Sequence, residues 1–163
     1  METKIPVVIL GATGSVGQKF VELLKDHPWF RIAALCASER SAGKQYKDAV
    51  NWFQSSELPE HIGQMIVQPC DATVMGRLAF SALDAAVAGS IEQAYAKAGY
   101  TVVSNSKNHR HHPDVPLLVP EINASHLELI QGQQFGEGKI ITNPNCSTIQ
   151  MVVALKPIHD KYH

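Results

Sequence analysis

The sequence has few cysteines, almost no net charge and no long apolar run, and each shortage excludes a class of protein. Its three cysteines (Cys36, Cys70 and Cys146) are widely spaced and odd in number, which argues against a disulfide framework and against a paired-cysteine metal site. Lys and Arg number 14 against 15 Asp and Glu, so nucleic acid or anionic membrane would not be attracted. No window approaches the ~20 apolar residues of a membrane span, and the N-terminus lacks a signal peptide's apolar stretch. We expect a cytoplasmic protein with neither nucleic-acid nor membrane partners.

Short apolar runs typical of buried strands recur along the chain, at residues 5–10, 31–37, 64–68, 78–83, 100–104, 117–119 and 139–142. Helical patterns lie between several of them. Val16, Phe20, Leu23 and Leu24 share one expected buried face, and residues 85–98 form an alanine-rich helix. Continuous apolar strands alternating with helices predict a Rossmann-type α/β fold, doubly wound around a mainly parallel sheet. Residues 43–59 and 105–116 are expected to be long loops.

A glycine-rich turn follows the first strand and opens the first helix, with the sequence Gly11-Ala12-Thr13-Gly14-Ser15-Val16-Gly17. In this context the first glycine permits the tight turn, the second lets main-chain N–H groups approach a pyrophosphate, and the third lets helix pack on strand. We therefore expect a dinucleotide to bind at Gly11, Thr13, Gly14, Ser15, Val16 and Gly17. The alternative is a plain glycine-rich turn without a ligand.

The segment after the second strand bears on which dinucleotide is bound. NAD sites carry an acidic residue there, which binds the ribose hydroxyls and repels a 2′-phosphate. Here Ser38, Arg40 and Ser41 offer two hydroxyls and a guanidinium, a set suited to a 2′-phosphate. Glu39 complicates the pattern, although it lies just past the strand end, where it can face solvent. We expect NADP rather than NAD; the alternative is a solvated turn in which Arg40 pairs with Glu39.

Cys146 lies in the run Thr142-Asn143-Pro144-Asn145-Cys146-Ser147-Thr148, in which a strand, a turn and the start of a helix follow one another. The N-terminus of a helix favours a thiolate and can hold an oxyanion. Residues 149–155 supply an apolar face for that helix. A thiolate beside a nicotinamide suggests covalent capture of an acyl group or an aldehyde. Cys36, by contrast, is expected in the core, and Cys70 is read as incidental.

Several motifs together resemble aspartate-semialdehyde dehydrogenase of the archaeal and fungal type. They are the glycine-rich turn, the Cys146 motif, residues 80–83 and 102–105, His109-Arg110, and residues 113–123. The resemblance covers essentially the whole chain, with the motifs in the family's order. It implies NADP-dependent reductive dephosphorylation of the acyl phosphate aspartyl 4-phosphate, through a Cys146 thioester, on the route to lysine, threonine and methionine.

The resemblance also implies roles for individual residues. Asn145 would orient the substrate at the thiol or stabilise an oxyanion, and Ser81 and Ala82 would lie beside the cofactor. Arg110 and Asn105, with Ser104 nearby, would hold the substrate phosphate; a leaving group with two negative charges requires a cation and neutral donors. The alternative for Arg110 is a solvated loop charge. The segment Ser106-Lys107-Asn108 departs from the form common in this family, and Lys107 is either part of the anion site or a surface residue.

The resembled family is about twice as long as this chain, and its second half carries the general base, an arginine for the substrate carboxylate and most of the contacts of a homo-oligomer. We therefore expect residues 1–146 to form the NADP-binding domain and residues 147–163 to begin a helix leading to an absent substrate and dimerisation domain. His159 and His163 are not assigned as the base. His159 lies roughly 20 Å along the helix from Cys146, and His163 lies farther still.

Other functions remain open from the sequence. One is another thioester-forming reductase, such as malonyl-CoA reductase; the Asn-Pro-Asn-Cys run disfavours N-acetylglutamyl-phosphate reductase. Another is a free-standing nucleotide-binding domain without catalysis. His109, His111 and His112 are crowded on a loop without a carboxylate or thiol to complete a ligand set, so no metal site is expected.

Overall fold

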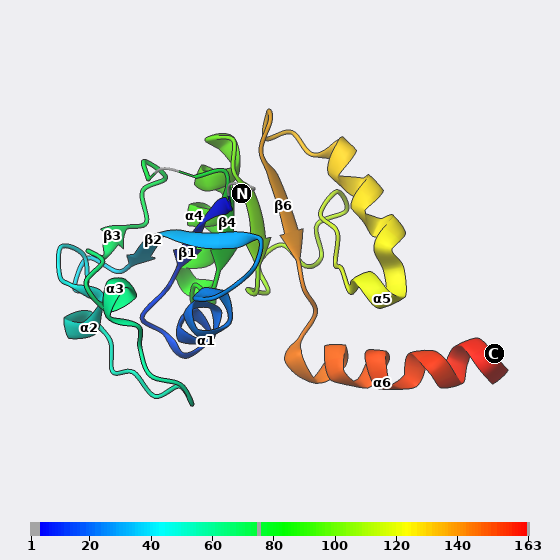
Figure 1. Ribbon diagram of the computed structural model, residues 1–163. Helices are drawn as coiled ribbons and strands as arrows, with labels where there is room; N and C mark the ends of the chain where they lie inside the picture. Colours follow the sequence, from blue (N-terminus) through cyan, green and yellow to red (C-terminus); the bar gives the residue numbers. More distant parts are fainter. Residues whose placement is uncertain (1–3, 75, 163) are drawn as a thin grey trace.

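The computed structural model describes residues 4–74 and 76–162, which form one open six-stranded parallel sheet with helices packed on both faces (Figure 1). The strands are β1 (Ile5–Leu10), β2 (Phe30–Ala37), β3 (Gln68–Pro69), β4 (Leu78–Ser81), β5 (Thr101–Ser104) and β6 (Lys139–Thr142). The helices are α1 (Ser15–Leu24), α2 (Tyr46–Ala49), α3 (Glu60–Gly63), α4 (Ala85–Lys97), α5 (Pro120–Asn123), the 3₁₀ helix η1 (Ala124–Gly132) and α6 (Cys146–Tyr162). The predicted Rossmann-type architecture is confirmed.

The strand order is β3-β2-β1-β4-β5-β6, so the chain builds outward from β1 in one direction and then returns to build in the other. The order therefore reverses between β1 and β4. In doubly wound sheets, ligands bind beyond the carboxyl ends of the strands at such a reversal. The glycine-rich turn at residues 11–17 follows β1 directly and lies at this position.

The sheet separates two apolar cores, and alternate residues of β1 enter opposite ones. Val7 and Ile9 are fully buried among the side chains of α1, α2 and α3, whereas Val8 and Leu10 are fully buried on the face that α4 covers. Both faces of the strand are therefore shielded from water. This explains why β1 is continuously apolar rather than alternating, as is typical of parallel sheets.

Two predicted strands differ from the structure. The run at residues 64–68 yields only the two-residue β3, and Ile66 within that run is 46% exposed. The run at residues 117–119 is not a strand; it passes beside β6, where Leu118 N–H donates to the Thr142 carbonyl at 2.8 Å. The other five predicted strands are confirmed, with ends shifted by two residues at most.

The predicted buried face of α1 was wrong in part. Val16 and Leu23 are 40% and 63% exposed, while Gly17, Gln18, Val21 and Leu24 are buried. A Cβ atom on Gly17 would lie 2.1 Å from the Gly11 carbonyl oxygen, so the helix approaches the turn through its glycine. This close approach rotates the helix and brings polar Gln18 into the core.

The two later helices lie where the sequence predicts them, but they pack differently. The alanine-rich segment forms α4, with Ala88, Tyr95 and Ala96 fully buried. In Figure 1, α6 extends away from the sheet, and its apolar residues Met151 and Leu155 are 55% and 50% exposed. Among the described helices none is long and apolar enough to cross a membrane.

The outer edge of β6 is covered by the side chain of Gln133, which takes the place of a neighbouring strand. Gln133 Oε1 accepts from Ile140 N–H at 2.8 Å, and its Nε2 donates to the Ile140 and Asp114 carbonyls, also at 2.8 Å. Unpaired main-chain groups at a sheet edge promote aggregation if left exposed, and they weaken the fold if buried without partners. Gln133 is 8% exposed and satisfies two such groups, both of Ile140, together with the loop carbonyl of Asp114.

Replacing Gln133 with alanine is expected to lower the free energy of unfolding by about 2–4 kcal/mol, because Ile140 N–H and two carbonyls lose their buried partner. Urea unfolding followed by circular dichroism measures the change. Gln134→Ala is the matched control, since Gln134 is an exposed neighbour, and it should change stability by less than about 0.5 kcal/mol. Equal stability of the two variants would contradict the edge-covering role.

Candidate dinucleotide and nucleophile site

The glycine-rich turn is shaped by two close main-chain approaches. Gly11 has φ +76°, and a Cβ there would lie 2.7 Å from the Ala82 carbonyl oxygen, so both conformation and space require glycine. Gly14 is the N-cap of α1, where no side-chain hydrogen bond caps the helix. The first-turn N–H groups are thus left to an outside acceptor, which suits a phosphate. A Cβ on Gly14 would come no closer than 3.5 Å to the protein, so its front is open.

Two buried polar side chains hold the turn in place from behind. Gln18 Nε2 donates to the Thr13 and Asn51 carbonyls at 3.1 and 3.2 Å, and its Oε1 accepts from Phe53 N–H at 3.2 Å. The Tyr46 hydroxyl donates to the Ala12 carbonyl at 2.7 Å, and burial raises the pKa of this phenol. The turn is therefore preorganised by the 46–53 segment. The sequence pattern did not reveal these contacts, because Gln18 was not on the predicted buried face.

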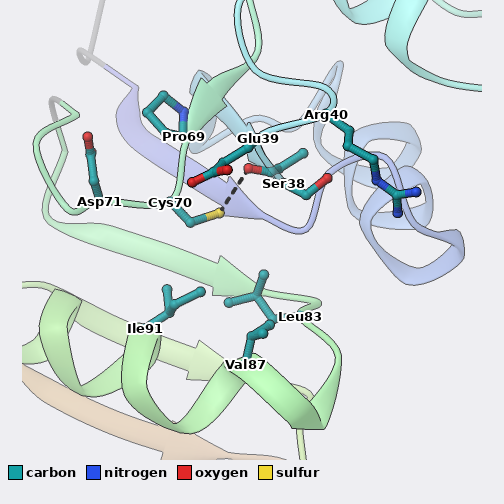
Figure 2. A pocket seen from close by; sticks show the side chains of 10 residues that line it. Ser38, Glu39, Arg40, Pro69, Cys70, Asp71, Leu83, Val87 and Ile91 are labelled. Carbon is teal, nitrogen blue, oxygen red and sulfur yellow. Dashed lines mark hydrogen bonds between the residues drawn. The ribbon is translucent and has the colours of Figure 1, made fainter.

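A pocket of about 570 Å³ lies beyond the ends of β2 and β3, beside the turn (Figure 2). Leu83, Val87 and Ile91 form one apolar wall at the start of α4, and Cys70 faces them from the segment after β3. The pocket adjoins the turn, because the Leu83 main chain lies 3.2 Å from the Gly11 Cβ position. A flat apolar group attached to a pyrophosphate held by the turn would enter this space.

The residues predicted to choose between NADP and NAD lie at this pocket with one exception. Ser38 and Arg40 line it and are exposed, whereas Ser41 is not among the lining residues; its N–H donates to the Ser38 carbonyl at 2.8 Å and closes a turn. Glu39 also lines the pocket, so it does not simply face bulk solvent as the sequence suggested. In Figure 2 the Glu39 carboxylate and the Arg40 guanidinium point in opposite directions, and no ion pair within residues 4–74 and 76–162 joins them.

Cys70, which the sequence left without a role, lines this pocket next to fully buried Cys36. A hydrogen bond between the two thiols lowers the pKa of Cys70 and raises that of Cys36, and burial adds to the rise at Cys36. The Gly11 main chain also lowers the pKa of Cys70. The prediction that Cys36 belongs to the core is confirmed. Cys70 belongs to the wall of the pocket.

A second polar group lies beyond the ends of β5 and β6. Asn143 Nδ2 donates to Asn105 Oδ1 at 2.8 Å, and Arg110 Nη2 donates to the Asn105 carbonyl at 3.0 Å. Arg110 Nε and Asn143 Oδ1 are buried and lack a hydrogen-bond partner within residues 4–74 and 76–162. The structure thus brings predicted Asn105 and Arg110 together and adds Asn143. The signal that could have identified Asn143 is its position directly after a strand.

Cys146 is exposed at the first residue of α6, immediately after this group. The Asn145 side-chain oxygen accepts from Ser147 N–H at 2.9 Å, and its main-chain oxygen accepts from Ile149 N–H at 3.0 Å. Asn145 therefore caps the helix and fixes the orientation of its first turn. This cap is a structural role that the sequence reasoning did not assign to Asn145, and it fixes the main chain on both sides of the thiol.

Ser81 ends β4 and Ala82 follows it beside the turn, but the two residues present different groups. Ser81 is fully buried and its hydroxyl donates to Glu92 at 2.6 Å, so this side chain is committed to the interior. Ala82 is partly exposed and touches the Gly11 position.

Of the other predicted residues, Lys107 is exposed, and Ser104 is buried with its hydroxyl also donating to Glu92. In the described part of the chain, no group of three or more His, Cys, Asp or Glu could hold a metal ion.

The sequence of this chain is similar to those of curated dehydrogenases. The chain is 49% identical over 162 residues to aspartate-semialdehyde dehydrogenase of Schizosaccharomyces pombe, and the match covers 96% of this chain and 45% of the relative. The enzyme of the same name from Archaeoglobus fulgidus is 45% identical, with 94% of this chain and 46% of the relative covered. The chain thus spans about half the length of the curated relatives it matches.

Among solved structures, aspartate-semialdehyde dehydrogenase with NADP from Candida albicans superposes with a TM-score of 0.90 at 45% identity, covering 98% of this chain and 48% of that one. The family model for the semialdehyde dehydrogenase NAD binding domain matches residues 6–130, which include the turn, the pocket, Asn105 and Arg110. This chain therefore belongs to the semialdehyde dehydrogenase family and contains its NAD binding domain.

Proposed function

We propose that this chain is the dinucleotide-binding and nucleophile-bearing part of an NADP-dependent aspartate-semialdehyde dehydrogenase, which reductively dephosphorylates aspartyl 4-phosphate. The observation that carries the proposal is the position of three features at one edge of the sheet. The glycine-rich turn follows β1, the Asn105–Arg110 group follows β5, and Cys146 follows β6. The relatives' shared name and the NADP in the Candida albicans structure support the same choice of substrate and cofactor.

In this proposal the Cys146 thiolate attacks the acyl carbon and expels phosphate, which leaves a thioester on the sulfur. Arg110 and the amides of Asn105 and Asn143 hold the phosphate and stabilise its charge as it departs. A bound NADPH would supply the hydride that reduces the thioester, and Cys146 would then leave as the thiolate when the aldehyde is released. First-turn N–H groups of α6 other than that of Ser147, which Asn145 accepts, would suit the oxyanion that forms on the carbonyl. This activity would serve the synthesis of lysine, threonine and methionine.

The dinucleotide fit rests on the glycines and the pocket. The pyrophosphate would lie at the first turn of α1, in front of Gly14, with Thr13, Ser15 and Val16 around it. The adenosine would enter the pocket between Cys70 and the α4 wall, and the 2′-phosphate would meet Ser38 and Arg40. A phosphate there must tolerate Glu39, and the Arg40 fork offers the compensating charge.

The proposal assigns only part of the catalytic machinery to these residues. The relatives are about twice as long. We infer that the general base, the arginine for the substrate carboxylate and a homo-oligomer interface belong to the portion that the relatives carry beyond this match. We infer a cytoplasmic location as well, because a reducing compartment keeps Cys146 a thiol.

The activity is tested by mixing the chain with the C-terminal portion of the Schizosaccharomyces pombe relative and following NADPH oxidation with aspartyl 4-phosphate. Malonyl-CoA and N-acetylglutamyl phosphate serve as competing substrates in parallel assays. We expect NADPH oxidation with aspartyl 4-phosphate and none with either competing substrate. Preference for either competitor would overturn the assignment of substrate, and NADP binding without turnover on any of the three would favour a non-catalytic domain.

Replacing Cys146 with alanine should abolish thioester formation, because the acyl group has no sulfur to join, and should leave NADP affinity within about twofold. Intact-mass measurement after exposure to aspartyl 4-phosphate detects the acyl adduct, and calorimetry measures NADP affinity. Ser147→Ala is the control, since Ser147 is the exposed neighbour on α6. Parallel loss of both properties would show that the substitution acts through folding.

Replacing Arg40 with glutamate should weaken NADP binding about 10- to 100-fold and change NAD binding little, because the lost partner and the new charge both face the 2′-phosphate. Glu39→Gln is the matched control and should leave NADP binding unchanged or tighter. Calorimetric titration of each variant with both dinucleotides measures the preference. An unchanged preference in the Arg40 variant would remove this residue from the cofactor site.

Alanine at Gly14 and at Gly17 should separate ligand binding from folding. At Gly14 the added methyl meets no protein atom closer than 3.5 Å but projects toward the pyrophosphate, so stability should fall by less than about 1 kcal/mol and affinity by about tenfold or more. At Gly17 the methyl would lie 2.1 Å from a main-chain oxygen, and stability should fall by about 3 kcal/mol. Thermal unfolding and NADP calorimetry measure the two effects. A Gly14 variant that binds normally would place the pyrophosphate elsewhere.

A further inference from the structure

Glu92 is a fully buried carboxylate on α4 to which the proposed mechanism gives no role. Its Oε1 atom accepts from the Ser81 hydroxyl at 2.6 Å and from the Ser104 hydroxyl at 2.7 Å. These serines are the last residues of β4 and β5, and they pair in register across the sheet. One carboxylate oxygen therefore joins the carboxyl ends of two neighbouring strands.

The other carboxylate oxygen faces His109. Glu92 Oε2 lies 3.5 Å from His109 Nε2, and the two side chains are 0% and 7% exposed. Within the described residues neither atom has a hydrogen-bond partner. Two lone pairs facing each other in a dry interior repel, so a proton must lie between these two atoms, on Nε2 or on Oε2.

His109 belongs to the same segment as the residues proposed to hold phosphate. Ser104 Oγ accepts from Ser106 N–H at 3.0 Å, and Arg110 Nη2 donates to the Asn105 carbonyl at 3.0 Å. The segment is thus attached to Glu92 at Ser104, before Asn105, and at His109, before Arg110. Its two anion-binding residues each directly follow one of these attachment points.

Burying a carboxylate is unfavourable by several kcal/mol, and apolar residues of similar volume often fill such positions without loss of stability. Glu92 therefore contributes something other than core volume. We propose that Glu92 is a positioning residue: by holding Ser81, Ser104 and His109, it fixes the 104–110 segment so that Asn105 and Arg110 converge on the substrate phosphate. The identity of the anion as substrate phosphate rests on the proposed function. The contacts of Glu92 with Ser81, Ser104 and His109 rest on the geometry alone.

The first test compares Glu92→Met, which keeps volume but removes both hydrogen-bonding oxygens, with Glu92→Gln, which keeps an acceptor for the serines and a polar partner for His109. Gln93→Met, at an exposed position on the same helix, is the matched control. Amide hydrogen exchange reports the order of residues 104–110, and NMR titration with inorganic phosphate, followed at Asn105 and Arg110, reports anion affinity. NADP calorimetry monitors the turn.

The methionine variant should speed exchange in residues 104–110 and weaken phosphate binding, each by about tenfold or more, with NADP affinity within about twofold of the original. The glutamine variant should recover most of both properties, and the control should match the original chain. If methionine at position 92 leaves exchange and phosphate binding unchanged, the positioning role is overturned. The same conclusion follows if glutamine behaves no better than methionine.

A second pair of variants changes His109 in place of Glu92, so its result does not depend on how α4 tolerates substitution. His109→Leu removes the polar group that faces Glu92, whereas His109→Gln retains a polar side chain at a similar reach. Faster exchange and weaker phosphate binding in the leucine variant, with recovery in the glutamine variant, support the proposal; identical behaviour of the two overturns it. If the unsubstituted chain does not bind phosphate at Asn105 and Arg110, the proposed anion site fails, and the exchange measurements alone still decide the role of Glu92.

Discussion

The site depends on the register of the parallel sheet. Leu10 pairs with Ser81, Ser81 with Ser104, and Ser104 with Thr142, so the last residues of β1, β4, β5 and β6 form one row. The residue that follows each of them must then emerge at the same edge. Those four residues are Gly11, Ala82, Asn105 and Asn143. Segments far apart in the sequence thereby meet at the edge without direct side-chain packing between most of them.

The fold was largely predictable because burial on both faces of a strand leaves a continuous apolar run. The failures share a physical cause. Periodicity assigns a buried face by counting apolar side chains, but α1 packs through Gly17, which has none, and so polar Gln18 is buried while Val16 is exposed. Similarly, the predicted strand at residues 117–119 pairs with β6 only at Thr142, and the Gln133 side chain takes the main-chain groups of Ile140.

Candidate site residues were predictable where the residue type and its place in the sequence pattern indicate a chemical role. A glycine turn after a strand, a thiol entering a helix and an arginine in a loop each carry a local signal. Asn143, Glu92 and Cys70 carry none, since their significance comes from neighbours on other elements: Asn105 for the first, two strand-end serines for the second, and the α4 wall for the third. Such contacts depend on tertiary structure and cannot be read from spacing along the chain.

Buried polar side chains hold loop segments at three positions in this fold, and the energetics explain how far each one reaches. Gln18 holds residues 51–53 through two hydrogen bonds, Glu92 holds the 104–109 segment through two contacts, and Gln133 holds residue 114 through one hydrogen bond. A hydrogen bond contributes a net ~0.5–1.5 kcal/mol, whereas ordering one residue costs ~1–2 kcal/mol of main-chain entropy. One such side chain can therefore order only a few residues. Gln18 and Glu92 act on segments beside the carboxyl ends of the strands, where the ligands would bind. Order is therefore concentrated where fixed donors would have to hold a phosphate.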